Sequence, residues 1–147
     1  MTVETTTTKQ QFTLNQVASQ FDFTFRALTT AATDIKARAT TGSTETLLTY
    51  TTDYTVTIST DGIGGNLWLV DKTAVSKGTL TVYRDTTDKQ ESDYDDYNQF
   101  PAQTLETDLD KRTMKSQELE EANDRALVLP ISVTGVDAEL PVPVASQ

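Results

Sequence analysis

The sequence contains no cysteine and no histidine. Without cysteine, the chain cannot form disulfides, zinc–thiolate sites or a thiol nucleophile. Without histidine, it lacks the base of a Ser-His-Asp triad, the imidazole ligands of many metal sites and the side chain that titrates near neutral pH. These two absences remove most familiar catalytic sites. We therefore expect a protein that is not an enzyme and that holds neither a metal ion nor a cofactor.

Apolar residues and positive charges are also scarce. Hydrophobic residues make up 36% of the 147 positions, which predicts a small core typical of a domain that gains stability by assembling. The net charge of -10 disfavours nucleic acid and anionic membranes as partners. No apolar run is long enough to span a bilayer, and no basic segment followed by an apolar one opens the chain. We thus expect neither a membrane span nor a signal peptide.

Short segments with a period of two follow one another between residues 12 and 86. In the first, Phe21, Phe23 and Phe25 alternate with polar side chains, as expected for a strand with one buried face. Arg26 is the last of these polar residues and is expected on the exposed face. The apolar run from Leu67 to Val70 is expected to be covered on both faces. Further alternating segments lie at residues 35–40, 46–50, 54–59 and 79–84, with turn-forming residues at 41–44, 61–65 and 76–78. Because no helical pattern intervenes, we predict a small antiparallel β-sandwich of five to seven strands over residues 12–86.

Polar segments flank this predicted sandwich on both sides. Residues 1–11 are rich in threonine and have no periodicity, which indicates a flexible N-terminal arm. Residues 87–99 form an acidic connector, and the acidic residues in and next to it are Asp85, Asp88, Glu91, Asp93, Asp95 and Asp96. The central glycine and closing glutamate of a calcium loop are missing, so a solvated connector is favoured over a metal site.

Residues 100–129 predict one long helix. After Pro101 the segment contains neither glycine nor proline, and it is rich in good helix formers. Pro101 suits the first helical turn, and Pro130 marks the end. Beyond it, residues 130–147 contain three prolines, at 130, 141 and 143, among valines and leucines, which favours an extended strap.

A heptad pattern defines a sparse apolar seam on this predicted helix. The seam positions are Leu105, Leu109, Arg112, Ser116, Leu119, Asn123 and Ala126. Because so thin a stripe cannot stabilise a lone helix in water, the helix must bury it against its own domain or against copies of itself. The pattern gives these two possibilities about equal weight. Polar residues on such a seam cost stability but fix register and oligomer number.

Several short motifs occur in a fixed order from about residue 12 to residue 143. They are DIKAR, TTDYTV, a strand with Gly-Gly, GTLTVYRD, SDY, FPAQTLETDLDK and DRALVLP. This order resembles the N-terminal virion-attachment region of podovirus-type phage tail fibres and tailspikes. In the helix, the matching residues are Phe100-Pro101-Ala102, Leu105, Leu109-Asp110-Lys111, Thr113-Met114, Gln117 and Arg125-Ala126-Leu127. Two features depart from the family pattern. Arg112 and Asn123 stand where such sequences usually carry apolar residues. Near the N-terminus, QFTLNQV replaces the YTG-like opening common in the family.

The resemblance implies a structural virion protein, made in the host cytoplasm and located in the phage tail. It implies a homotrimer whose helices bundle through the seam, whose sandwiches attach to tail or neck proteins, and which continues into a fibre or tailspike. Tyr94, Phe100, Pro101 and Ala102 would form the corner between sandwich and helix. The alternatives are direct receptor binding by the β-domain and a polysaccharide depolymerase using Asp93, Asp95 and Asp96. Adjacent acids in a solvated loop lack the walled cleft that such catalysis needs.

Overall fold

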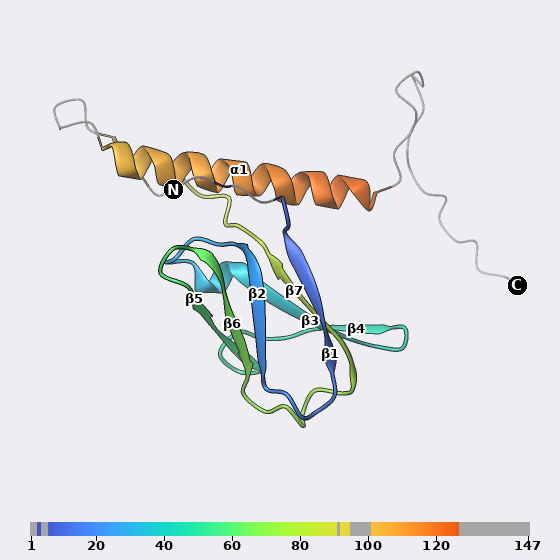
Figure 1. Ribbon diagram of the computed structural model, residues 1–147. Coiled ribbons are helices and arrows are strands. Elements are labelled where there is room, and N and C mark those ends of the chain that lie inside the picture. The colour runs from blue at the N-terminus through green and yellow to red at the C-terminus, as the bar shows by residue number, and fades with distance from the viewer. Residues whose placement is uncertain (1–2, 4–5, 91, 95–100, 127–147) are drawn as a thin grey trace, which may run out of the picture.

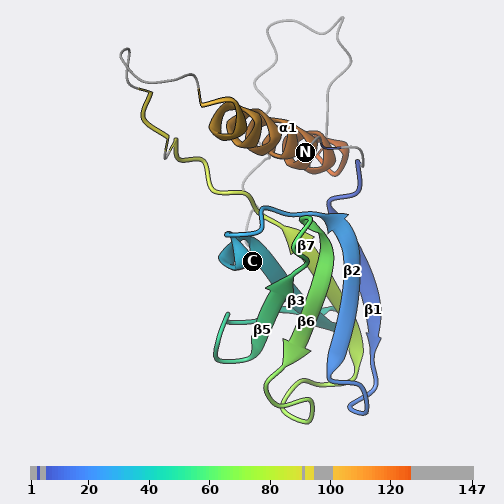
Figure 2. The same cartoon turned by 60° about the vertical axis from the view of Figure 1, so that its left-hand side comes forward.

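The computed structural model describes residues 3, 6–90, 92–94 and 101–126, and within them the chain forms seven strands and one long helix. Four strands form one antiparallel sheet in the order β1-β7-β3-β4, and three form a second in the order β2-β6-β5. The sheets pack face to face, and the helix α1 lies across one end of the sandwich (Figures 1 and 2). The predicted antiparallel sandwich followed by a long helix is therefore confirmed. The elements are β1 Lys9–Leu14, β2 Gln20–Arg26, η1 Ala32–Asp34, β3 Ile35–Thr41, β4 Thr44–Leu47, β5 Tyr54–Ile58, β6 Ile63–Leu69, β7 Gly78–Arg84 and α1 Ala102–Asp124.

The core lies between the inward faces of the two sheets. Phe23 and Phe25 of β2 stack there with ring centroids 4.7 Å apart, and Leu80 and Val82 of β7 are fully buried opposite them. Tyr54 is also fully buried, and its hydroxyl donates a hydrogen bond to the carbonyl oxygen of Ile35 at 2.9 Å. The alternation predicted for β2, β3, β5 and β7 thus corresponds to the inward and outward faces of real strands.

The structure corrects two expectations about which side chains are buried. Arg26 was expected on the solvent face of its strand, but the pairing of β2 with β6 shifts register between Phe23 and Arg26, and Arg26 is only 6% exposed. The run from Leu67 to Val70 was expected to be covered on both faces. Trp68 and Val70 are instead 44% and 61% exposed. Trp68 lies on the outward face of β6, which is open to solvent, and Val70 follows the last residue of that strand.

Several boundaries also differ from the predicted ones. β4 ends at Leu47 instead of continuing to Tyr50, because the Asp53 carboxylate accepts a 2.7 Å hydrogen bond from the amide of Thr49 and the chain turns there. β1 begins at Lys9, inside the segment predicted as a flexible arm. The helix spans 23 residues, so it is about 35 Å long and shorter than predicted. Phe100 and the predicted strap at 130–147 lie outside the described residues.

A close approach of two strands explains one glycine and yields a first prediction. A Cβ atom on Gly65 of β6 would lie 2.3 Å from the carbonyl oxygen of Thr57 and 2.8 Å from the ring of Phe23. We expect Gly65→Ala to lower the free energy of unfolding by about 1–3 kcal/mol, because the strands must move apart to admit the methyl group. Urea denaturation measures this loss. Ser43→Ala on the exposed β3–β4 loop is the control and should change stability by less than about 0.5 kcal/mol. Equal losses in the two variants would contradict the steric explanation.

Candidate functional site

Two buried arginines lie at the end of the sandwich that α1 covers. Arg84 is the last residue of β7 and follows Leu80 and Val82 at the spacing of two that points side chains into the core. Arg26 is the last residue of β2. Their side chains are 1% and 7% exposed, and such deeply buried cations require charged or hydrogen-bonding partners.

Arg84 finds its partners on α1 and on β2. Its Nε donates to Oε1 of Glu118 at 2.8 Å, and its Nη2 donates to Oε1 of Gln117 at 3.0 Å and to the carbonyl oxygen of Met114 at 3.2 Å. Its Nη1 donates to the carbonyl oxygen of Arg26 at 2.5 Å. Burial lowers the pKa of the Arg84 guanidinium, but an arginine stays charged at neutral pH, so the pair with Glu118 is ionic. One side chain therefore ties the helix to both sheets.

The remaining contacts extend this joint along the helix. Asp110 lies 3.4 Å from Nη2 of Arg26, one helical turn before the fully buried Met114. Near the end of α1, Glu121 pairs with Lys9 of β1. We call Asp110, Met114, Gln117, Glu118 and Glu121 the docked face of α1. It is mostly polar, with Met114 as its buried apolar residue, so ion pairs and hydrogen bonds fix the helix on the sandwich.

The first residues after β7 are held between the sandwich and the helix. The amide and hydroxyl of Thr86 donate to the carboxylate of Glu118 at 2.9 and 2.5 Å, and Lys115 donates to the carbonyl oxygen of Thr86 at 3.0 Å. The hydroxyl of Thr87 donates to the buried Asp34 of η1 at 2.8 Å. The acidic connector is thus fastened at its start.

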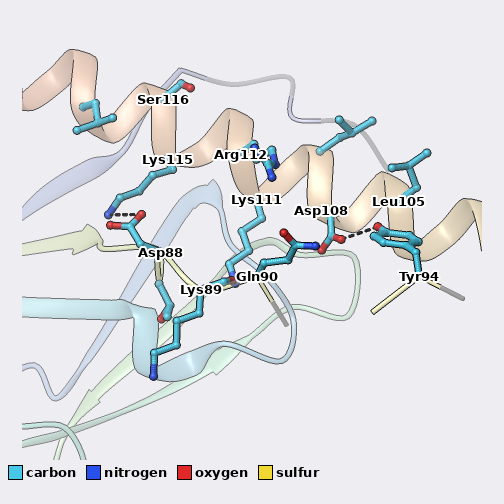
Figure 3. A pocket seen from close by; sticks show the side chains of 13 residues that line it. Asp88, Lys89, Gln90, Tyr94, Leu105, Asp108, Lys111, Arg112, Lys115 and Ser116 are labelled. Carbon is cyan, nitrogen blue, oxygen red and sulfur yellow. Dashed lines mark hydrogen bonds and ion pairs between the residues drawn. The ribbon is translucent and has the colours of Figure 1, made fainter. Parts of the chain in front are cut away.

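The connector and α1 enclose a groove of about 600 Å³ (Figure 3). Tyr94 points to the helix, and its hydroxyl donates to Asp108 at 2.5 Å, beside the hydroxyl of Ser92, which donates to Asp108 at 2.9 Å. The hydrogen bond from Tyr94 contributes most to lowering the pKa of the Asp108 carboxyl, and the hydrogen bond from Ser92 lowers it further. Lys111 donates to the carbonyl oxygen of Lys89 at 2.5 Å. Tyr94 therefore contacts the helix near its start.

The other residues predicted for the corner, and the acidic residues of the connector, are exposed, line the groove or lie outside the described residues. Pro101 and Ala102 are exposed at the start of α1. Asp88 lies 3.5 Å from Lys115, and Asp93 is exposed. The predicted depolymerase residues Asp95 and Asp96, together with Glu91 of the acidic segment, lie outside the described residues. Among the residues that are described, no group of three or more carboxylates is arranged to hold a metal ion, and no helix is long and apolar enough to cross a membrane.

The predicted seam lies on the opposite side of α1 from the docked face. Each residue advances about 100° around a helix, so Leu105 and Asn123, each nine positions from Met114, lie about 180° from it. Leu109 and Leu119 are 55% and 63% exposed. Leu105 is half-buried, and the exposed seam residues also include Arg112, Ser116, Asn123 and Ala126. The helix does pack on its own domain, but it does so through residues outside the predicted seam.

Sequence reasoning missed the residues that join the helix to the sandwich, although two signals were present. Arg84 is in phase with the core residues Leu80 and Val82, where a charged side chain needs a partner. Asp110, Met114 and Glu118 recur every four residues, which places them in one row along a helix. Neither pattern says which cation meets which carboxylate, because those residues are distant in sequence.

No protein-family model matches this chain, and no curated protein matches it significantly.

Proposed function

We propose that this chain is a trimeric anchor of a phage tail fibre or tailspike, which attaches the host-recognition fibre to the tail. The order of motifs that resembles virion-attachment regions is the basis of the proposal. The observation that carries it further is the division of α1 into two faces. One face is occupied by the chain's own sandwich. On the other, most of the predicted seam is exposed, and its residues Leu105, Leu109, Arg112, Ser116 and Leu119 line the groove beside the connector.

The exposed seam suits association between copies of the helix. Leu109 and Leu119 project from α1 on the side away from the sandwich, and Ser116 lies between them. Large apolar side chains that recur along one exposed helix face mark an interaction surface. Parallel helices from three copies would bury these leucines around a common axis, while the polar seam residues would set the register.

The joint between helix and sandwich gives such an assembly a defined geometry. Because Arg84 binds both Glu118 and the backbone of Arg26, α1 is held at a fixed angle across the sandwich. Three helices around one axis would then hold three sandwiches in fixed directions. A rigid threefold mount of this kind presents identical surfaces to the tail and multiplies weak receptor contacts made by the fibre beyond it.

The state of association tests this proposal. We expect the purified chain to have three times its 16.2 kDa mass by light scattering coupled to size exclusion. Leu109→Asp combined with Leu119→Asp should give monomers, because buried carboxylates in the bundle would have no partners. Leu47→Asp is the matched control, since Leu47 is a similarly exposed leucine of β4 away from the helix, and it should leave the trimer intact. A wild-type monomer, or a double variant that remains trimeric, would contradict the proposal.

A further inference from the structure

The outward face of the three-stranded sheet carries an ordered polar grid around one aromatic ring. β6 is the central strand of this sheet, and Trp68, the only tryptophan of the chain, points outward from it. The helix lies across the end of the sandwich and leaves this face open (Figure 2). Trp68 is 44% exposed, although a side chain of this size is usually covered more fully unless it contacts a ligand or partner.

Strand register fixes the neighbours of the indole ring. Trp68 is paired with Gln20 of β2 on one side and with Thr55 of β5 on the other. The next outward row is Asn66 on β6, flanked by Asp22 and Thr57. Strands lie about 4.8 Å apart and alternate residues about 6.7 Å apart, so the six side chains form a compact grid on one face.

The polar members of this grid are oriented before any ligand arrives. The amide nitrogens of Gln20 and Asn66 both donate to Oδ1 of Asp22, at 2.8 and 2.6 Å. These exposed hydrogen bonds hold the two amides and the carboxylate beside the ring instead of leaving them to rotate freely. Groups already held in place lose less conformational entropy on binding, which favours affinity.

We propose that this face binds a neutral saccharide, with Trp68 as the stacking platform and Asp22, Asn66 and Gln20 as the hydrogen-bonding edge. A pyranose ring has an apolar C–H face, which fits an exposed indole, and an edge of hydroxyl groups, which both donate and accept. The grid offers amide, carboxylate and hydroxyl groups that can do the same. The ligand is uncharged because the Asp22 carboxylate and the net charge of -10 repel sugar acids and sulfated glycans.

A protein partner fits this face less well. Protein interfaces concentrate their energy in a fully desolvated apolar centre, with polar groups at the rim. Here five hydrogen-bonding side chains surround the indole within the grid itself. A protein would have to desolvate all of them, whereas a saccharide would satisfy them with its hydroxyl groups.

Tryptophan fluorescence gives a direct test, because Trp68 is the sole source of indole emission. The full chain would be titrated with maltotriose, cellotriose, chitotriose and mannotriose up to about 10 mM, with sialyllactose as an anionic comparison. We expect a saturable change in emission with at least one neutral sugar and none with sialyllactose. Asn66→Ala, which keeps the reporter, should weaken that binding about tenfold, and Ile63→Ala, on an exposed position of the same strand, should not.

Calorimetry with the same sugar extends the test to the ring itself. Trp68→Ala should abolish measurable binding, and Trp68→Phe should retain part of it, which also controls for loss of folding. The proposal is overturned if no sugar of the panel gives a saturable signal. It is also overturned if binding survives both Trp68→Ala and Asn66→Ala. The oligomeric state does not enter these measurements, so they are independent of the trimer proposal.

Discussion

Replacing Arg84 by alanine is expected to lower the free energy of unfolding by about 3–5 kcal/mol, because it leaves the carboxylate of Glu118 buried without its main cation. The side chain of Arg84 is 1% exposed, and its guanidinium donates hydrogen bonds to Glu118, Gln117 and two backbone carbonyl groups. Loss of these contacts should release α1 first. Denaturant unfolding measures the stability loss. In amide hydrogen exchange, the increase in exchange rate from wild type to variant should be larger in α1 than in β2 or β6.

Arg38 provides the matched control for this experiment. It lies on the neighbouring strand β3 and pairs with Glu45 at 3.5 Å, but both side chains are more than 40% exposed. Solvent screens such a pair, and Arg38 also donates a hydrogen bond to the hydroxyl of Tyr83 at 3.2 Å. Arg38→Ala should therefore cost about 1 kcal/mol, well below the loss expected for Arg84→Ala. A combined Arg84→Met and Glu118→Leu variant should recover part of the loss, because it removes both buried charges together. Equal losses for Arg84→Ala and Arg38→Ala would show that the buried joint does not hold the helix.

Stability at alkaline pH is expected to fall through the ionisation of Tyr54. Burial raises the pKa of this fully buried phenol from 10.0 to about 12. Because the pKa is higher in the folded chain, the unfolded chain loses its proton first as the pH rises. The stabilisation is complete below pH 10 and is lost as the pH rises toward about 12. The loss should be about 1.4 kcal/mol at pH 11 and approach about 2.7 kcal/mol above pH 12.

Tyr54→Phe isolates this contribution. The variant keeps the ring in the core but cannot ionise, and it should lose about 1 kcal/mol at neutral pH because the carbonyl oxygen of Ile35 loses its donor. Free energies of unfolding measured from pH 8 to pH 11 should fall more steeply for the wild type, so that the two proteins converge. Parallel curves would mean that Tyr54 does not titrate differently in the folded and unfolded chains.

The sequence supported accurate predictions wherever one local pattern controlled the structure. Alternation at Phe21, Phe23 and Phe25, and again at Leu80 and Val82, identified strands and their buried faces, because side chains on a strand point alternately to its two sides. The same logic was wrong at Arg26, where a register shift interrupts the period. A different pattern was wrong at Trp68: the continuous apolar run from Leu67 to Val70 predicted cover on both faces, but Trp68 lies on the open face of its sheet.

The sequence by itself determined that this chain forms a small antiparallel sandwich followed by one long helix, because both patterns are set by neighbouring residues. Only the tertiary structure decided which face of the helix meets the sandwich. Arg84 and Glu118 are 34 positions apart, and Arg26 and Asp110 are 84 apart, so no local pattern links them. The buried cations at the end of the sandwich select the carboxylates of α1, since burying them without partners costs more free energy than exposing the leucines on its opposite face.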